Sequence, residues 1–317
     1  MKNFITTLLI LIMSGTLYAQ SANPPGLKYI KESDLKKDLY ALADAHFNGR
    51  SAGTLDELKA SMWLVEKYRS IGLIPAGEDG TYLQFFNLWR NHISDNSIIK
   101  INNTVFPLWK EVAVAQMANA TLVAPIVYLG NASNIDTLQL DIKNKVVAIE
   151  ASSKGINTNV SLPTWRYSRS VLTKYGMPLI RKGVAAIIII ADDIAEKAWD
   201  DAAENFKRGT YDIDGGANTT VTTTVPVLWL HSNTKSLLQN NTAFINAHME
   251  VNRFTYPSVN IIGKINGTDP TLKDEYVLYS GHQDAHGIRN AHNNDSTYYG
   301  ADDNASVDVA MLANARA

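Results

Sequence analysis

A continuous apolar run at residues 184–190 constrains the fold of this chain more than any other feature of its sequence. Its central part, 186–190, is one alanine followed by four isoleucines, with no alternation of polar and apolar residues. Such a run is typical of a strand that is covered on both faces, as in parallel sheets flanked by helices. Two more runs rich in β-branched residues, 126–129 and 146–149, indicate neighbouring strands. We therefore expect an α/β fold.

The segments around these strands complete a module of the same kind. Residues 170–182 have helical spacing, and 225–230 is a further apolar strand. We expect another helical stretch at 234–249. The stretch 192–224 contains two adjacent glycines and runs of threonine, so we expect it to be surface loop. Together these segments predict one self-contained α/β module at about 96–250.

Helices are expected before this module. Ser33 can cap a first helix, and Thr54 begins a second one in a capping box with Glu57. Between them lies the glycine-containing loop 46–53, which includes Arg50. The Arg50 guanidinium could bind a substrate carboxylate, but we expect it to form a structural salt bridge.

Strands are expected after the module. The apolar segments 259–265 and 276–280 are separated by a turn-rich stretch and form either a hairpin or neighbouring strands. The second one leads directly into His282, and a helix is expected to begin near Ala305.

The residues around these last elements are the candidates for chemistry. His282 and Asp284 flank one residue at the end of an expected strand, so their side chains can point to the same face. Asp284 could fix the tautomer of a metal-bound His282, or could itself be a ligand. Asp302 and Asp303 precede an expected helix, where adjacent carboxylates would repel each other unless they are solvated or bind a cation. An acidic residue at a helix start is also common for structural reasons alone.

Composition excludes several kinds of function. The chain has 29 basic and 31 acidic residues, a formal net charge of −2 and no basic block, so we expect no nucleic acid partner. It has no cysteine, which excludes thiol nucleophiles, iron–sulfur clusters and Cys-based zinc sites. Any metal must therefore be held by His and carboxylate side chains.

The first residues have the pattern of an export signal. Lys2 supplies a positive charge, 4–13 is apolar, and Ala19 offers a small residue before a cleavage point. We expect a signal peptide at 1–19, a secreted or periplasmic mature protein, and no stable membrane span after cleavage. The alternative is an uncleaved anchor, but the apolar run is shorter than the roughly 20 residues that a spanning helix needs.

Two motifs near the C-terminal end resemble a known family: Gly281-His282-Gln283-Asp284 and Gly300-Ala301-Asp302-Asp303-Asn304-Ala305-Ser306. Together they resemble the opening motif pair of the M28 family of zinc aminopeptidases and carboxypeptidases. The segment 260–267 resembles the strand before that pair, and 48–54 resembles part of the family's leading helices. The middle module, through 182–189 and 225–227, resembles the protease-associated (PA) insert of many members.

The resemblance implies a fold and a domain order. It implies a zinc-exopeptidase-like mixed sheet, incomplete here, with an inserted PA-like α/β module. The N-terminal helical part would comprise 20–95, the PA-like insert 96–250, and the start of a truncated metallopeptidase catalytic domain 251–317.

The resemblance also implies a site and an activity. His282 would bind one of two zinc ions, Asp302 would bridge both, and Asp284 would orient His282. The peptide bond between Asp302 and Asp303 would be cis. The substrates would be peptides or proteins, and we expect an aminopeptidase that hydrolyses N-terminal peptide bonds.

Two departures from the family pattern bear on this interpretation. Val307 stands where the family usually has glycine. The family's general-base Glu and its other ligands lie after the bridging Asp, beyond the last residue here, so we expect this chain alone to be inactive. Two alternatives stay open: a non-catalytic receptor or binding protein on the same fold, and an M28-type cyclase.

Overall fold

The computed structural model describes the chain in two compact units. One comprises Met1–Phe86 with Ser258–Ala317, and the other comprises Asn87–Pro257. Both borders fall inside long strands, β2 (Leu83–Ile93) and β12 (Val251–Ile261), and therefore differ from the borders at 96 and 250 that the sequence suggests. The described residues are 23–137, 139–158, 165–213, 225–240 and 242–317. The predicted signal peptide, 1–19, lies outside them.

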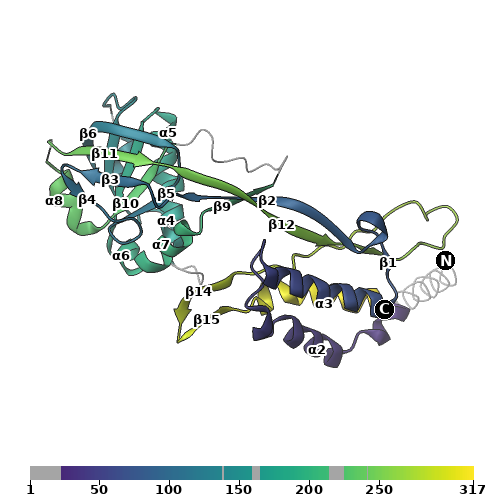
Figure 1. Cartoon of the computed structure of the whole chain (residues 1–317). Helices are drawn as coiled ribbons and strands as arrows, with labels where there is room; N and C mark the ends of the chain where they lie inside the picture. The colour runs from purple at the N-terminus through teal and green to yellow at the C-terminus, as the bar shows by residue number, and fades with distance from the viewer. Residues whose placement is uncertain (1–22, 138, 159–164, 214–224, 241) are drawn as a thin grey trace, which may run out of the picture. The chain divides into compact units, whose positions relative to one another are not determined.

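The unit Asn87–Pro257 is built on an eight-stranded mixed sheet with the order β4-β3-β11-β6-β7-β8-β10-β5 (Figure 1). Its central strands β6, β7, β8 and β10 are parallel, and its other pairs are antiparallel. The predicted strands near 126, 146, 186 and 227 are thereby confirmed. The strands are β3 (Ile98–Ile101), β4 (Thr104–Val105), β5 (Val112–Gln116), β6 (Ala120–Asn131), β7 (Val146–Glu150), β8 (Ala186–Ile190), β10 (Val227–Leu230) and β11 (Phe244–Met249).

Strand β8 is covered on both faces, as its composition predicts. All five of its residues are at most 2% exposed. Ile188 and Ile190 belong to one apolar cluster, and Ile187 and Ile189 belong to another. Helices supply residues to the second cluster: α4 (Trp165–Val171), α5 (Met177–Arg181), α6 (Asp193–Lys197) and α7 (Trp199–Lys207). A π-helical turn, Leu172–Gly176, joins α4 to α5 within the predicted helix.

Two predictions for this unit are wrong. The stretch 234–249 is a short helix, α8 (Lys235–Leu238), followed by β11. Along β11 the residues alternate between exposed and buried, and the strand lies between β3 and β6, so pairing decides its conformation. The expected loop at 192–224 contains α6, α7 and β9 (Thr210–Ile213). Asp192 caps α6 by accepting a hydrogen bond from the Ala195 amide at 3.0 Å.

Among its described residues, the unit Met1–Phe86 with Ser258–Ala317 contains three longer helices and two short strand pairs, and His282 and Asp284 lie in a segment outside them. Its helices are α2 (Glu32–Leu42), α3 (Leu55–Ile71) and α9 (Ser306–Arg316). Its strand pairs are β1 (Ile74–Pro75) with β13 (Gly263–Lys264), and β14 (Gly287–His292) with β15 (Asp295–Tyr298). Short helical turns of this unit lie at Pro25–Tyr29, Ala45–Phe47, Glu78–Gly80 and Ala301–Ala305. Those of the unit Asn87–Pro257 lie at Ala132–Thr137 and Ser232–Thr234.

Local sequence signals set the ends of α3. Thr54 accepts a hydrogen bond from the Glu57 amide at 3.3 Å, as predicted. Glu57 turns back to the Gly53 amide at 2.6 Å, one residue earlier than a capping box requires. Gly72 ends the helix with φ +87°, a conformation that glycine adopts readily. The predicted cap of α2 is not formed, because Lys31 rather than Ser33 is its N-cap residue.

One buried carboxylate joins the three helices of this unit. Asp38 on α2 is 2% exposed and pairs with Lys67 of α3 at 2.7 Å and with Arg316 of α9 at 2.5 Å. Burial alone would raise the pKa of Asp38, but the two cationic partners hold it below its usual value. The pairing fixes α9, and with it the segment that precedes α9, against the helical layer.

The predicted strand at 276–280 is absent. Tyr276, Val277 and Leu278 are between 82% and 91% exposed, and no strand is assigned there. The sheets formed by the described residues include no partner for this segment. Apolar and β-branched residues favour a strand only where another strand can pair with it, so composition alone is not sufficient.

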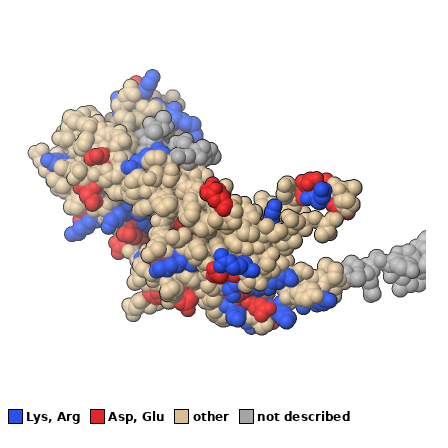
Figure 2. Space-filling view, turned by 45° about the vertical axis from the view of Figure 1, so that its right-hand side comes forward, with Lys and Arg blue, Asp and Glu red and all other residues tan. Residues whose placement is uncertain are grey.

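No helix in the described part of the chain has both the length and the apolar character that crossing a membrane requires. Figure 2 shows that basic and acidic side chains are interspersed over the visible face, with no extended region of one sign.

Candidate metal centre

Two chain segments far apart in the sequence are hydrogen-bonded beside the candidate residues. Ser51 and Ala285 form an isolated parallel β-bridge. The Ala285 amide donates to the Arg50 carbonyl at 3.0 Å, and the Gly287 amide donates to the Gly49 carbonyl at 2.9 Å. The segment that carries His282 is therefore fixed by its main chain to the loop between α2 and α3.

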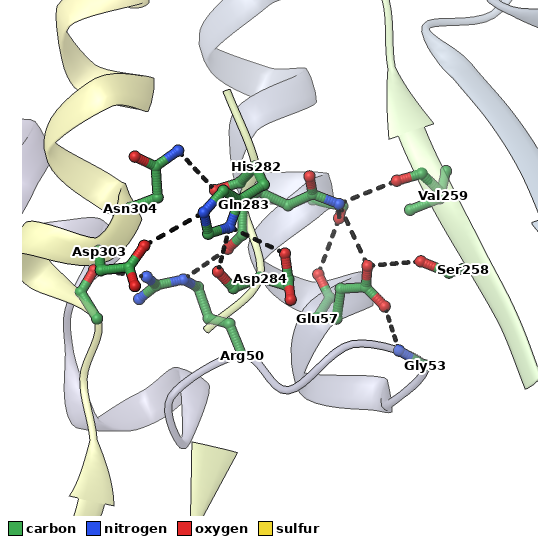
Figure 3. A network of polar contacts seen from close by, with 12 residues as sticks. Arg50, Gly53, Glu57, Ser258, Val259, His282, Gln283, Asp284, Asp303 and Asn304 are labelled. Atoms are coloured by element: carbon green, nitrogen blue, oxygen red, sulfur yellow. Dashed lines mark hydrogen bonds and ion pairs between the residues drawn. The ribbon is translucent and has the colours of Figure 1, made fainter. Parts of the chain in front are cut away.

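The His282 imidazole lies between two carboxylates (Figure 3). Its Nδ1 atom is 3.1 Å from Asp284 Oδ1 and 3.1 Å from the Asp284 carbonyl. Its Nε2 atom is 3.2 Å from Asp303 Oδ1. The side chain of His282 is 56% exposed and that of Asp303 is 73% exposed, so both can be reached from solvent. A carboxylate behind Nδ1 with Nε2 turned outward is the arrangement in which histidine binds a metal.

The structure distinguishes the two adjacent aspartates. Asp303, and not Asp302, forms the ion pair with His282. Asp303 has φ −110° and ψ +91°, which are not helical values, although it lies within the turn Ala301–Ala305. Asp302 is exposed, and its carbonyl accepts a hydrogen bond from the Ser306 hydroxyl at 2.7 Å. The cis peptide bond joins Asp303 to Asn304, one bond later than the resemblance implies.

The spacing of His282 and Asp303 fits two donors of one zinc ion. Zinc–nitrogen and zinc–oxygen distances of about 2.0–2.2 Å at a tetrahedral angle separate two donor atoms by about 3.3–3.6 Å. The observed separation of 3.2 Å is close to this value. In the described part of the chain, however, no group of three or more His, Cys, Asp or Glu side chains is arranged so that it could hold a metal ion. These residues thus provide a pair of donors, fewer than the three protein ligands of a typical catalytic zinc site.

The side chain of Gln283, which lies between His282 and Asp284 in the sequence, points away from the His282 and Asp284 side chains. Its amide nitrogen donates to the Val259 carbonyl at 2.9 Å and to Glu57 Oε1 at 3.3 Å (Figure 3). Glu57 in turn accepts from the Ser258 hydroxyl at 2.7 Å. Glu57 is 3% exposed, and burial raises its pKa above the usual value. These contacts anchor the peptide from which His282 and Asp284 project.

Arg50 is fully buried beside the same segment. It donates four hydrogen bonds, all to main-chain carbonyls: from Nε to Gln283 at 2.8 Å, from Nη1 to Leu42 and Tyr299 at 2.7 Å each, and from Nη2 to Gly300 at 2.9 Å. No carboxylate of the described residues lies within ion-pair distance of it, so the expected salt bridge is not formed. The N–H groups that would form a salt bridge already donate hydrogen bonds to main-chain carbonyl oxygens.

Asp308 on α9 is a further buried carboxylate near the pair. It is 7% exposed, and its Oδ2 atom has no hydrogen-bond partner within the described residues. Burial raises its pKa to about 6, although the charges of Arg50 and His282 act in the opposite direction. Asp308 lies outside the sequence motifs that point to the site. Its signal was an acidic residue among apolar ones, since Ala305, Val309 and Leu312 of the same segment are all buried.

The other histidines have different partners. His286 Nδ1 is 2.6 Å from an Arg289 nitrogen, and its ring lies edge-on to Tyr298. His231 is 2.7 Å from Glu196 and stacks on Trp199 in the other unit.

Residues 260–317 match the model of peptidase family M28, and this segment contains His282, Asp284, Asp302 and Asp303. The similarity to peptidase family M28 is thus shown for this C-terminal segment of the chain. No curated protein matches the sequence significantly.

Solved structures give weaker similarities. An aminopeptidase from Aneurinibacillus sp. strain AM-1 is 16% identical, with 91% of this chain and 59% of that chain covered, at a TM-score of 0.47. The zinc aminopeptidase BSAP from Bacillus subtilis is 15% identical, with 90% of this chain and 57% of that chain covered, at a TM-score of 0.43. The subtilisin-like protease Apa1 from an Antarctic Pseudoalteromonas, strain AS-11, is 11% identical, with 51% of this chain and 35% of that chain covered, at a TM-score of 0.26. TM-scores below 0.5 do not establish a common fold. The chain spans less than two thirds of the length of each of these proteins.

Gly300, immediately before the turn Ala301–Ala305, allows a test of how tightly this region is packed. It has φ +60°, and a Cβ atom there would lie 2.4 Å from the Ala285 Cβ and 2.8 Å from Arg50 Nη2. We expect Gly300→Ala to lower the free energy of unfolding by about 2 kcal/mol more than Gly80→Ala does. Gly80 is the matched control, since it has φ +73° but open space around the same position. Urea unfolding measures both, and equal losses would contradict the tight packing.

Proposed function

We propose that this chain contributes His282 and Asp303 to the zinc site of an M28 metallopeptidase that hydrolyses peptides. The observation that carries the proposal is the 3.2 Å separation of His282 Nε2 and Asp303 Oδ1, with Asp284 behind the ring. The match of 260–317 to the peptidase family supports it.

Each residue has a distinct role in this proposal. Asp284 accepts the proton of His282 Nδ1, which leaves Nε2 without a proton and able to bind a cation. Asp303 supplies an oxygen donor and a negative charge on the other side. Bound zinc would lower the pKa of a coordinated water to about 7 and would polarise the scissile carbonyl. The bridging role of Asp302, which the resemblance implies, stays a prediction beside that of Asp303.

The finer features are also part of the proposal. A second zinc ion, aminopeptidase rather than carboxypeptidase specificity, and peptide or protein substrates follow from the resemblance to zinc aminopeptidases. The apolar segment 4–13 after Lys2 supports export to a secreted or periplasmic location. The middle module is proposed to be a PA-like insert.

Hydrolysis of aminoacyl-nitroanilides by the protein expressed from its complete coding sequence tests the proposal. We expect the activity to disappear when a chelator removes the metal and to return when zinc is added, because the water nucleophile depends on the ion. A chelator-treated protein that is passed through the same buffer exchange and given magnesium instead is the control.

Two outcomes would contradict the proposal in different ways. Hydrolysis that persists in the chelator would exclude a metal mechanism. Zinc binding without any peptide hydrolysis would favour the alternative of a non-catalytic binding protein on the same fold.

A further inference from the structure

Arg50 connects the two segments that carry the candidate donors. Its Nε atom donates to the carbonyl of Gln283, which lies directly between His282 and Asp284. Its Nη2 atom donates to the carbonyl of Gly300, three residues before Asp303. One rigid guanidinium therefore bonds to the main chain beside each donor, and its planar shape fixes the two bonds relative to each other.

A third bond attaches the same group to the helical layer, and a fourth adds to its contacts with the segment that leads to Asp303. Nη1 donates to the carbonyl of Leu42, the last residue of α2, and to the carbonyl of Tyr299. Leu42 is fully buried and belongs to the apolar cluster of this unit. The guanidinium thus holds both donor segments to a part of the core.

The backbone at Arg50 is in an unfavourable conformation that aims the side chain inward. Asn48, Gly49 and Arg50 have φ values of +46°, +70° and +51°. Left-handed conformations are uncommon and unfavourable for residues other than glycine. The main-chain bonds of Gly49 and Arg50 to Gly287 and Ala285 maintain this conformation. Such strain persists where surrounding contacts determine it, and it is frequent at functional sites.

The electrostatic setting is unusual for an arginine. The side chain is 0% exposed, yet only carbonyl oxygens accept its hydrogen bonds. Burial lowers the pKa of Arg50, while the charges of Asp308 and Asp284 act to raise it. Arginine stays charged under such conditions, and lysine offers a single compact charge without the fork of donors.

We propose that Arg50 is a positioning residue that holds the His282 and Asp303 segments at the separation required to share a metal ion. The part concerning the metal rests on the proposed function. The part concerning the positions of the two segments rests on the hydrogen bonds alone.

Arg50→Lys tests the positioning, because it keeps the charge and most of the length. The readout is hydrogen exchange of three amides in the held segments, at Ala285, Gly287 and Ala305, each of which donates a main-chain hydrogen bond. We expect these amides to exchange at least about tenfold faster than in the wild type, since most of the carbonyl contacts of Arg50 are lost. The amides of α3 should change less than twofold.

Arg90→Lys is the matched control. Arg90 lies in the other unit, where its Nε atom donates to the Arg208 carbonyl at 2.9 Å and its Nη1 atom donates to the Tyr256 hydroxyl at 3.0 Å. It should leave the three amides unchanged. Uniformly faster exchange across α3 and the three amides in Arg50→Lys would indicate general destabilisation and would overturn the inference, as would unchanged exchange.

Zinc affinity, measured by competition with a chromophoric chelator, tests the link to the metal. We expect Arg50→Lys to bind zinc at least about tenfold more weakly, because substituting a residue that orients metal ligands typically has an effect of this size. Arg90→Lys should bind zinc like the wild type. Selectively faster exchange with unchanged zinc affinity would overturn the metal part of the inference. A wild type that binds no zinc would refute the proposed function itself, and the exchange data would still decide the positioning.

Discussion

Asp303→Asn is expected to weaken zinc binding by about 100-fold or more, while the same change at the neighbouring Asp302 weakens it by less than about tenfold. The reason is geometric. Asp303 Oδ1 lies 3.2 Å from His282 Nε2, whereas Asp302 does not form that ion pair. Loss of a direct ligand should exceed the 10–100-fold effect that is typical of changes behind a ligand. Chelator competition measures the affinity, and kcat/KM for an aminoacyl-nitroanilide should follow the same order.

The two variants control each other. Each removes one negative charge and keeps nearly the same shape, and the two sites are adjacent, so general electrostatic effects should be similar. Both side chains are exposed, so neither change should unfold the protein. The reverse order of effects would restore Asp302 as the ligand, as the resemblance implies. Equal small effects would show that neither aspartate binds the ion.

The sequence predicts the parallel strands of the larger unit because their signal is strong and local. Residues 186–190 have a continuous apolar and β-branched pattern that is typical of a strand covered on both faces. Strand β11 carries a weaker signal, because Asn246 and His248 alternate with buried residues and only its pairing with β3 and β6 reveals it. The segment 276–280 shows the opposite error, since it has strand composition but no strand partner among the described residues.

The sequence likewise predicts only part of the candidate site. The two-residue spacing of His282 and Asp284 is a property of extended chain, so sequence predicts that they lie together. Which of Asp302 and Asp303 faces His282 depends on the non-helical dihedral angles of Asp303, which no local pattern specifies. The contacts of Arg50 with carbonyls more than 230 residues away depend on the folded main chain, and therefore no charge pattern could indicate them.

Asp308 should make the stability of the metal-free protein depend on pH. Burial on α9 raises its pKa to about 6, against 3.8 for an unperturbed aspartate. The folded protein therefore binds this proton more tightly than the unfolded chain does. The resulting contribution to stability is fully present below about pH 4 and is lost as the pH rises through 6. A difference of about two pKa units corresponds to about 3 kcal/mol.

Comparison with Asp308→Asn isolates this contribution. Between pH 4 and pH 7, we expect the free energy of unfolding of the wild type to fall by about 2 kcal/mol relative to that of the variant, since part of the full difference is already lost at pH 4. Urea unfolding at both pH values measures the difference, and Asp79→Asn, at an exposed position of the same unit, controls for the change in net charge. Carboxyl NMR should give a titration midpoint near 6 for Asp308. A midpoint below 4 would mean that the charges of Arg50 and His282 outweigh burial, and the difference between wild type and variant would then not decrease between pH 4 and pH 7.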